Sequence, residues 1–257
     1  MIKRQNVILL GLFGFSLASC SSTRTTEPTV NVSSMASRTT THLVDATPSK
    51  MHNAIDDNKR HNAIDEYKLS RDAAFSKGVK AYNEKDYTTA AKWFRQAAEQ
   101  GLAKAQFLFG IMHAKGEGIA QNNQEAIKWC QKAAEQGNTQ AQFGLGQKYH
   151  KGEGVAQNDR EAVKWYQKAA EQGYPQAQYN LGMMYANGKG VAQNDREAVK
   201  WYQKAAKQGD AQAQYELGVM YDKGRGVAED DQEAVKWYQK AADQGLTQAQ
   251  STLGGDV

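Results

Sequence analysis

The sequence predicts an all-α solenoid of antiparallel helix pairs, and two periodic features of its 257 residues indicate this fold. Tryptophan recurs every 36 residues, at Trp93, Trp129, Trp165, Trp201 and Trp237. Glycine keeps the same interval, at Gly101, Gly137, Gly173, Gly209 and Gly245. A fixed period of roughly 20–50 residues is the signature of a repeat array, in which each unit stacks on the next.

The first helix of each unit is illustrated by residues 139–151. Ala141, Leu145 and Tyr149 are four residues apart and form one apolar stripe, with Gly146 beside it. The following Gly152 and the second glycine two residues later are expected to end this helix, because glycine readily adopts the left-handed conformation found at helix C-termini.

The second helix is expected to begin after Asn158. Asparagine is a favoured N-cap, and Glu161 three residues later completes a capping-box pattern. The same pair recurs as Asn122/Glu125, Asn194/Glu197 and Asp230/Glu233. The apolar side of this helix carries Ala162, Val163, Trp165, Tyr166, Ala169 and Ala170.

Stacking of neighbouring units is expected to bury the tryptophans. A buried tryptophan removes about 150–250 Å² from water, which corresponds to an upper bound of about 4–6 kcal/mol each. The repeat domain is predicted over residues 67–257. Its units are placed at about 69–101, 103–137, 139–173, 175–209 and 211–245, with a terminal half-repeat at 247–254 that can cover the last apolar face.

The unit resembles the Sel1-like repeat, a relative of the tetratricopeptide repeat, over about residues 103–254. The matching residues are Ala141, Leu145-Gly146, Tyr149, Gly152-x-Gly154-Val155, Asp159, Ala162, Trp165-Tyr166, Ala169-Ala170 and Gly173. Residues 69–101 have a shorter loop without the glycine pair and are more similar to a tetratricopeptide unit. The resemblance implies a right-handed superhelix with a concave groove, and a role as an adaptor or scaffold for other proteins.

The N-terminus is typical of a bacterial lipoprotein signal peptide over residues 1–19. Lys3 and Arg4 precede an apolar stretch at residues 7–17, which is shorter than the roughly 20 residues that span a bilayer. The tetrad that ends at Cys20 is similar to the lipobox, whose cysteine is acylated and anchors the chain to the membrane. Since Ser21 is not aspartate, the sorting rule of such lipoproteins implies, for a cell with two membranes, the outer membrane, with the body on its periplasmic or surface face.

Residues 20–66 are expected to form a mostly disordered, Ser/Thr-rich tether, because few of them can bury apolar surface. Residues 52–56 and 61–65 have the same sequence, and their spacing of nine fits no helical repeat, so this part is interpreted as weakly helical or as tether. The formal net charge of +4 falls to +2 without Lys3 and Arg4, which is too small to predict a nucleic-acid partner.

Enzymatic chemistry is not indicated by any motif. The glycine pairs follow helices and lack the Gly-Lys-Ser/Thr of a phosphate loop, and no catalytic triad motif occurs. No histidine, cysteine and carboxylate set has metal-ligand spacing; His113, for example, takes the place of Tyr149 in the next unit. We therefore expect no enzyme, no cofactor and no metal.

Cys130 stands where the other units have Phe94, Tyr166, Tyr202 and Tyr238. It is interpreted as a core thiol, with a reactive or intermolecular thiol as the alternative. Some Sel1-like proteins carry cysteine pairs in every repeat, and penicillin binding has been proposed for such members. The chain lacks these pairs, which counts against an enzyme of the β-lactamase kind.

The candidate binding surface is a groove lined by the first helices, as in tetratricopeptide-like pairs. It would consist of an aromatic row with adaptable neighbours: Phe75, Phe107, Phe143, Tyr179, Tyr215, Gln147, Met183 and His150. Aromatic and methionine side chains are frequent at peptide-binding surfaces. The alternative is that the rings simply pack between helices.

The function predicted from the sequence is therefore a non-enzymatic interaction module. It would be tethered to the bacterial envelope and would bind a protein or peptide in its groove. Two alternatives stay open: a cell-wall-associated hydrolase or binder of penicillin or peptidoglycan fragments, and a passive structural lipoprotein.

Overall fold

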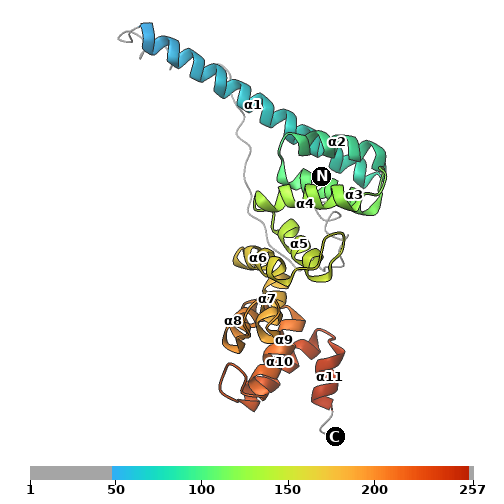
Figure 1. The fold of residues 1–257 in the computed structure, drawn as a ribbon, viewed down its shortest axis with the longest axis vertical. Helices are drawn as coiled ribbons and strands as arrows, with labels where there is room; N and C mark the ends of the chain where they lie inside the picture. Colours follow the sequence, from blue (N-terminus) through green and yellow to red (C-terminus); the bar gives the residue numbers. More distant parts are fainter. Residues whose placement is uncertain (1–47, 255–257) are drawn as a thin grey trace.

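The structure, a computed structural model, describes residues 48–254 and contains eleven α-helices there, with side chains described from residue 62 onward. In chain order these are α1 (Pro48–Asn83), α2 (Tyr87–Glu99), α3 (Ala103–Lys115), α4 (Asn123–Glu135), α5 (Thr139–Lys151), α6 (Asp159–Glu171), α7 (Pro175–Asn187), α8 (Asp195–Lys207), α9 (Ala211–Asp222), α10 (Asp231–Asp243) and α11 (Thr247–Gly254). Each helix packs mainly against its neighbours in the chain, and the pairs stack in one column (Figure 1). The predicted all-α solenoid is confirmed.

The first helix reaches into the predicted tether. Helix α1 begins at Pro48 and runs for 36 residues, so residues 48–66 are helical, which agrees with the helical one of the two interpretations left open for residues 52–65. Its N-terminal part projects away from the stacked pairs (Figure 1), and Ile64 and Leu69 on this part are exposed. Proline favours the first helical position, where no backbone donor is needed. The predicted signal peptide and Cys20 lie outside the described residues.

Glycines shape the turn inside each repeat, as predicted. Gly116, Gly152 and Gly188 are left-handed C-caps, with φ of 71°, 74° and 64°. The second glycine of the pair has another role. A Cβ atom on Gly190 would lie 2.3 Å from the Asp159 carbonyl oxygen, so this loop rests on the start of the preceding repeat's second helix. The glycine pairs therefore allow successive repeats to approach closely.

Only one half of the predicted capping box forms at the start of the second helices, namely the hydrogen bonds to the N-cap side chain. The Asn158 side chain accepts hydrogen bonds from the backbone amides of Arg160 and Glu161. The reciprocal half of the capping box does not form. The backbone amide of Asn158 donates instead to the backbone carbonyl of Tyr149 at 2.8 Å, and the Glu161 carboxylate pairs with Lys164. Asn158 thus ties its helix back to the first helix of the same repeat.

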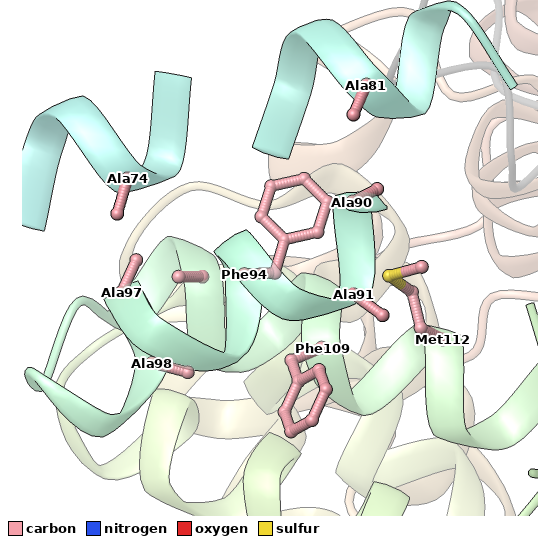
Figure 2. Close-up of a cluster of buried hydrophobic side chains, with 10 residues drawn as sticks. Ala74, Ala81, Ala90, Ala91, Phe94, Ala97, Ala98, Phe109 and Met112 are labelled. Atoms are coloured by element: carbon pink, nitrogen blue, oxygen red, sulfur yellow. The ribbon is translucent and has the colours of Figure 1, made fainter. Parts of the chain in front are cut away.

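The core is centred on the residue that follows each tryptophan. Phe94 and Tyr166 are 0% and 1% exposed, and Figure 2 shows the Phe94 ring directed towards α1 among small alanines. Of the five tryptophans only Trp165 is buried, and the others are partly exposed. Each lies under a lysine ammonium, which for Trp165 is that of Lys168 at 4.3 Å from the ring centre. The expectation of fully buried tryptophans is therefore wrong at four positions.

The buried polar side chains of the described region are four glutamines at one repeat position, Gln106, Gln142, Gln178 and Gln214. Each donates a side-chain hydrogen bond to a carbonyl at the end of the preceding repeat's second helix. For Gln142 this acceptor is Ala134 at 3.0 Å. Each of these carbonyls also accepts the backbone amide of the glycine that follows its helix. The glutamine adds a second hydrogen bond from the next repeat and so joins successive repeats.

Candidate protein-binding face

The predicted aromatic row lies deeper in the solenoid than expected. Phe107 and Phe143 are only 8% and 7% exposed, and both belong to the core. Tyr179 and Tyr215 are partly buried, and each ring lies against a tyrosine of its own repeat's second helix, at centroid distances of 5.9 and 5.5 Å. Phe75 contacts Phe94 in the same way. Interhelical packing accounts for these rings, and the expected exposure is wrong at Phe107 and Phe143.

The neighbours of the aromatic row have different environments. Gln147 and Met183 are partly exposed, and the same repeat position is taken by Ile111 and Val219. His150 is engaged within its own repeat, since its Nδ1 atom is 2.6 Å from the Asp159 carboxylate. Gln147 and Met183 therefore remain candidates for contact with a ligand, whereas His150 mainly braces the turn before α6.

A second row on the first helices was not predicted from the sequence. It lies one helical turn before the row of Ile111 and is likewise partly exposed. The two rows together are called the first-helix face: Leu108, Ile111, Gly144, Gln147, Asn180, Met183, Glu216 and Val219. These residues lie beside the buried stripe of each helix and are partly exposed, so this face is accessible to a partner along the first helices.

The polarity of each residue in the second row depends on the residue 14 positions earlier in the chain, which lies on the second helix of the preceding repeat. Where that helix carries a tyrosine the row is polar, as in Tyr166 with Asn180 and Tyr202 with Glu216. Where it carries Phe94, the row has Leu108, which packs against the same core cluster. A comparison of aligned repeats could have found this pairing, because a buried hydroxyl needs a polar neighbour.

Electrostatics single out Glu216 on this face. Burial raises the pKa of its carboxyl, and the positive charges of Arg225 and Lys223 only partly oppose this shift. Burial, and after it the negative charge of Glu216, raises the pKa of Tyr179 to about 12 and also raises the pKa of Tyr202. Glu216 therefore lies close to two tyrosines in a weakly hydrated setting.

A hollow of about 410 Å³ lies on the other side of the first repeats, between α2 and α4. Phe109, His113 and Trp129 line it, and Phe109 contacts both other rings edge-on. Ala91 also lines the hollow, and the equivalent position of the later repeats is occupied by the larger Ile127 or by valine. Burial lowers the pKa of His113, which favours a neutral imidazole. The hollow therefore arises from small residues and was not predicted.

Cys130 is a core residue, 6% exposed, and contributes to the same cluster as Phe107. Burial raises the pKa of its thiol to about 11. A thiol with such a pKa is a poor nucleophile at neutral pH, because the thiolate is the reactive species. These properties favour the interpretation as a core thiol.

Membrane and metal features were sought in the described part of the chain. None of the helices between residues 48 and 254 is both long and apolar enough to cross a bilayer. Over the same range, no three or more histidine, cysteine or carboxylate side chains are grouped so that they could hold a metal ion.

Comparison with known proteins identifies the repeat. The Sel1 repeat family matches residues 66–102, 103–138, 139–174, 175–210 and 211–246 without a gap. The chain belongs to the Sel1 repeat family. The first unit, which was expected to be closer to a tetratricopeptide repeat, is matched as a Sel1 repeat like the others. Sel1-repeat proteins are generally scaffolds that bind other proteins, and the family is typically non-catalytic.

Two solved structures of Sel1-repeat proteins are similar to the chain. The first is c5321, described as a protective antigen present in uropathogenic Escherichia coli strains, with 44% identity and a TM-score of 0.62. The second is a Sel1 repeat protein from Oxalobacter formigenes, with 39% identity and a TM-score of 0.61. The matches cover 64% and 66% of this chain, but only 35% and 49% of those proteins. No curated protein matches the chain.

Proposed function

We propose that the chain is a lipid-anchored, non-enzymatic interaction module of the bacterial envelope that binds a segment of another protein on its first-helix face. The observation that carries this proposal is the partial exposure of apolar side chains at one position in three of the four repeats between residues 103 and 246, with Gln147 at this position in the fourth. Ile111, Met183 and Val219 all occupy it. Aligned apolar side chains on an open helical face are a common basis for binding protein segments, and methionine adapts to varied partners.

The proposal is tested by site-specific photocrosslinking in the native cell. A photoreactive residue at Met183 or Gln147 samples the first-helix face, and one at Lys164 samples the exposed side of α6 as a matched control. We expect a discrete adduct with another protein from Met183 and Gln147, and none from Lys164. Equal labelling from all three positions, or no adduct from a folded and well-expressed protein, would contradict binding on this face.

Lipid anchoring is the second part of the proposal and rests on the Cys20 motif. Two acyl chains or more are needed for stable anchoring, since one chain alone binds only weakly. We expect metabolic labelling with radioactive palmitate to mark the wild-type chain and not the Cys20→Ser variant. Fractionation is expected to place the wild type in the outer membrane. Label on the variant, or wild-type protein in the soluble fraction, would contradict anchoring at Cys20.

The two alternatives from the sequence, a cell-wall hydrolase or fragment binder and a passive structural lipoprotein, are not favoured by the comparisons. The crosslinking experiment separates the passive lipoprotein from the interaction module, because only the module requires a specific adduct. Turnover of purified peptidoglycan fragments would be the observation that favours a hydrolase.

A further inference from the structure

Charge changes in one direction along the first helices. The equivalent stretches 103–115, 139–151, 175–187 and 211–223 have net charges of +2, +2, 0 and −1, with histidine taken as neutral. The charged residues are Lys104 and Lys115, Lys148 and Lys151, none in the third stretch, and Glu216, Asp222 and Lys223 in the fourth. The second helices α4, α6, α8 and α10 have net charges of 0, 0, +2 and −1 and show no such order.

The acidic end of this gradient contains a carboxylate that no cation of the described region neutralises directly. Glu216 is partly buried, and within residues 62–254 its side chain forms no hydrogen bond or ion pair. The nearby guanidinium of Arg225 is committed to Asp195, with two hydrogen bonds of 2.7 and 3.2 Å. Burial without a partner is unfavourable for a carboxylate, and the raised pKa of Glu216 agrees with this.

The surroundings of Glu216 favour a basic side chain of a bound ligand. Tyr179 and Tyr202 are close enough to sense its charge, and their rings lie 5.9 Å apart. A lysine or arginine side chain placed here would gain a charge-assisted hydrogen bond from the carboxylate and attraction to the aromatic faces. An acidic or apolar side chain would leave the carboxylate unpaired.

We infer that the partner segment on the first-helix face is itself dipolar. A lysine or arginine of this segment lies against Glu216 on α9, and acidic residues towards its other end lie over Lys104 on α3 and Lys148 on α5. The other two lysines of these helices, Lys115 and Lys151, already pair with Glu117 and Glu153 at 3.5 and 3.6 Å. The inference rests on the proposed function and specifies the chemistry of its partner. The repeats from α3 to α9 span on the order of 30 Å if neighbouring units are about 10 Å apart, a distance that an extended dodecapeptide covers.

The test uses a phage-displayed library of random dodecapeptides, selected on the detergent-purified full chain. Dissociation constants of the selected peptides are then measured against the wild type, Glu216→Gln, Met183→Asp and Glu171→Gln. Glutamine keeps the shape of Glu216 and removes its charge, so the variant is expected to fold, and its thermal unfolding is recorded to establish this. Glu171 lies exposed on α6 and is the control for loss of one negative charge.

We expect the selected peptides to carry a lysine or arginine towards one end and acidic residues towards the other. Glu216→Gln is expected to weaken their binding tenfold or more, and Glu171→Gln less than twofold. Peptides that lose affinity with Met183→Asp but not with Glu216→Gln would overturn the dipolar partner and leave binding on this face standing. Peptides insensitive to both changes, or no selected peptides, would overturn both proposals.

Discussion

The Gln172 side-chain amide donates a hydrogen bond of 2.7 Å to the side-chain oxygen of Gln142, across 30 residues of sequence. Gln142 in turn donates to the Ala134 carbonyl at the end of α4. One buried glutamine on α5 therefore links the second helix of the preceding repeat to the second helix of its own. The same hydrogen bond recurs in three other places, where Gln136 donates to Gln106, Gln208 to Gln178 and Gln244 to Gln214.

Replacing Gln142 with leucine is expected to destabilise the solenoid. The change removes two hydrogen bonds, from Gln142 to the Ala134 carbonyl and from Gln172 to Gln142, while the Ala134 carbonyl keeps the backbone amide of Gly137 at 3.0 Å. A hydrogen bond of this kind contributes about 0.5–1.5 kcal/mol. The buried leucine side chain offsets part of this loss, so we expect a net loss of about 1 kcal/mol, which lowers Tm by about 2–4 °C. Thermal denaturation followed by circular dichroism measures this.

The control for this prediction is Gln131→Leu. Gln131 is exposed on α4 and donates only to Glu135 in its own helix. Exposed pairs of this kind contribute a few tenths of a kcal/mol, so a shift of less than about 1 °C is expected. Equal effects of the two substitutions would show that the glutamine ladder contributes nothing special to stability.

The fold could be predicted from the sequence because the same 36-residue pattern recurs along the chain. The 36-residue interval of Trp165 and Gly173 fixes the repeat, and the caps at Gly152 and Asn158 fix the helix ends. The glutamine ladder was missed, since glutamine is usually a surface residue and only its packing shows that Gln142 is buried.

The candidate face was predicted only in part. The analogy with tetratricopeptide-like pairs placed Gln147 and Met183 on the groove side of the first helices, and they are partly exposed. It could not show that Phe143 turns inward, because the direction of an aromatic ring depends on the tyrosine that it meets on the second helix. Glu216 went unnoticed because one acidic residue on a helix is usually a solvated one, and its burial depends on the neighbouring repeat.

Two glycines of α5 are expected to respond to alanine in opposite ways. A Cβ atom on Gly146 would lie 2.5 Å from the Tyr166 ring, whereas a Cβ atom on Gly144 would meet nothing within 4 Å. Gly146→Ala therefore forces repacking, at a cost of about 1–3 kcal/mol. Gly144→Ala is expected to stabilise the helix by about 0.5–1 kcal/mol, because alanine has the higher helix propensity.

Urea denaturation of the two glycine variants gives both free energies of unfolding under the same conditions. The variants differ only in position, two residues apart on one helix, so each is the control of the other. A loss of stability from Gly144→Ala would contradict the open space beside Gly144, and no loss from Gly146→Ala would contradict the close approach of α5 and α6 at Tyr166.

The hollow beside Ala91 predicts a stabilising substitution. Isoleucine is the residue at the same position of the next repeat, and Ala91→Ile would place three more carbons against Phe109 and Trp129. Each buried methylene contributes about 0.8 kcal/mol, but the hollow is open to solvent, so we expect a gain of about 1–2 kcal/mol. Tm should rise by about 2–8 °C.

The adjacent Ala90 provides the contrast, since it is fully buried and does not line the hollow. Ala90→Ile is expected to destabilise the protein through overpacking, by about 1–3 kcal/mol. If Ala91→Ile also lowered Tm, the hollow between α2 and α4 would not have room for the side chain.

The Cys130 thiol is expected to resist alkylation in the folded protein. With a pKa of about 11, only about 0.1% of it is thiolate at pH 8, and its 6% exposure further limits access. Labelling with a maleimide, followed by mass spectrometry, is done on the full-length Cys20→Ser chain so that Cys130 is the one remaining cysteine. We expect no adduct under native conditions and one adduct in guanidinium chloride.

Because the thiolate fraction rises with pH, native labelling should increase above pH 9 and still remain slower than that of a small thiol. Rapid native labelling at pH 8 would contradict a core position and would favour the reactive thiol that the sequence left open.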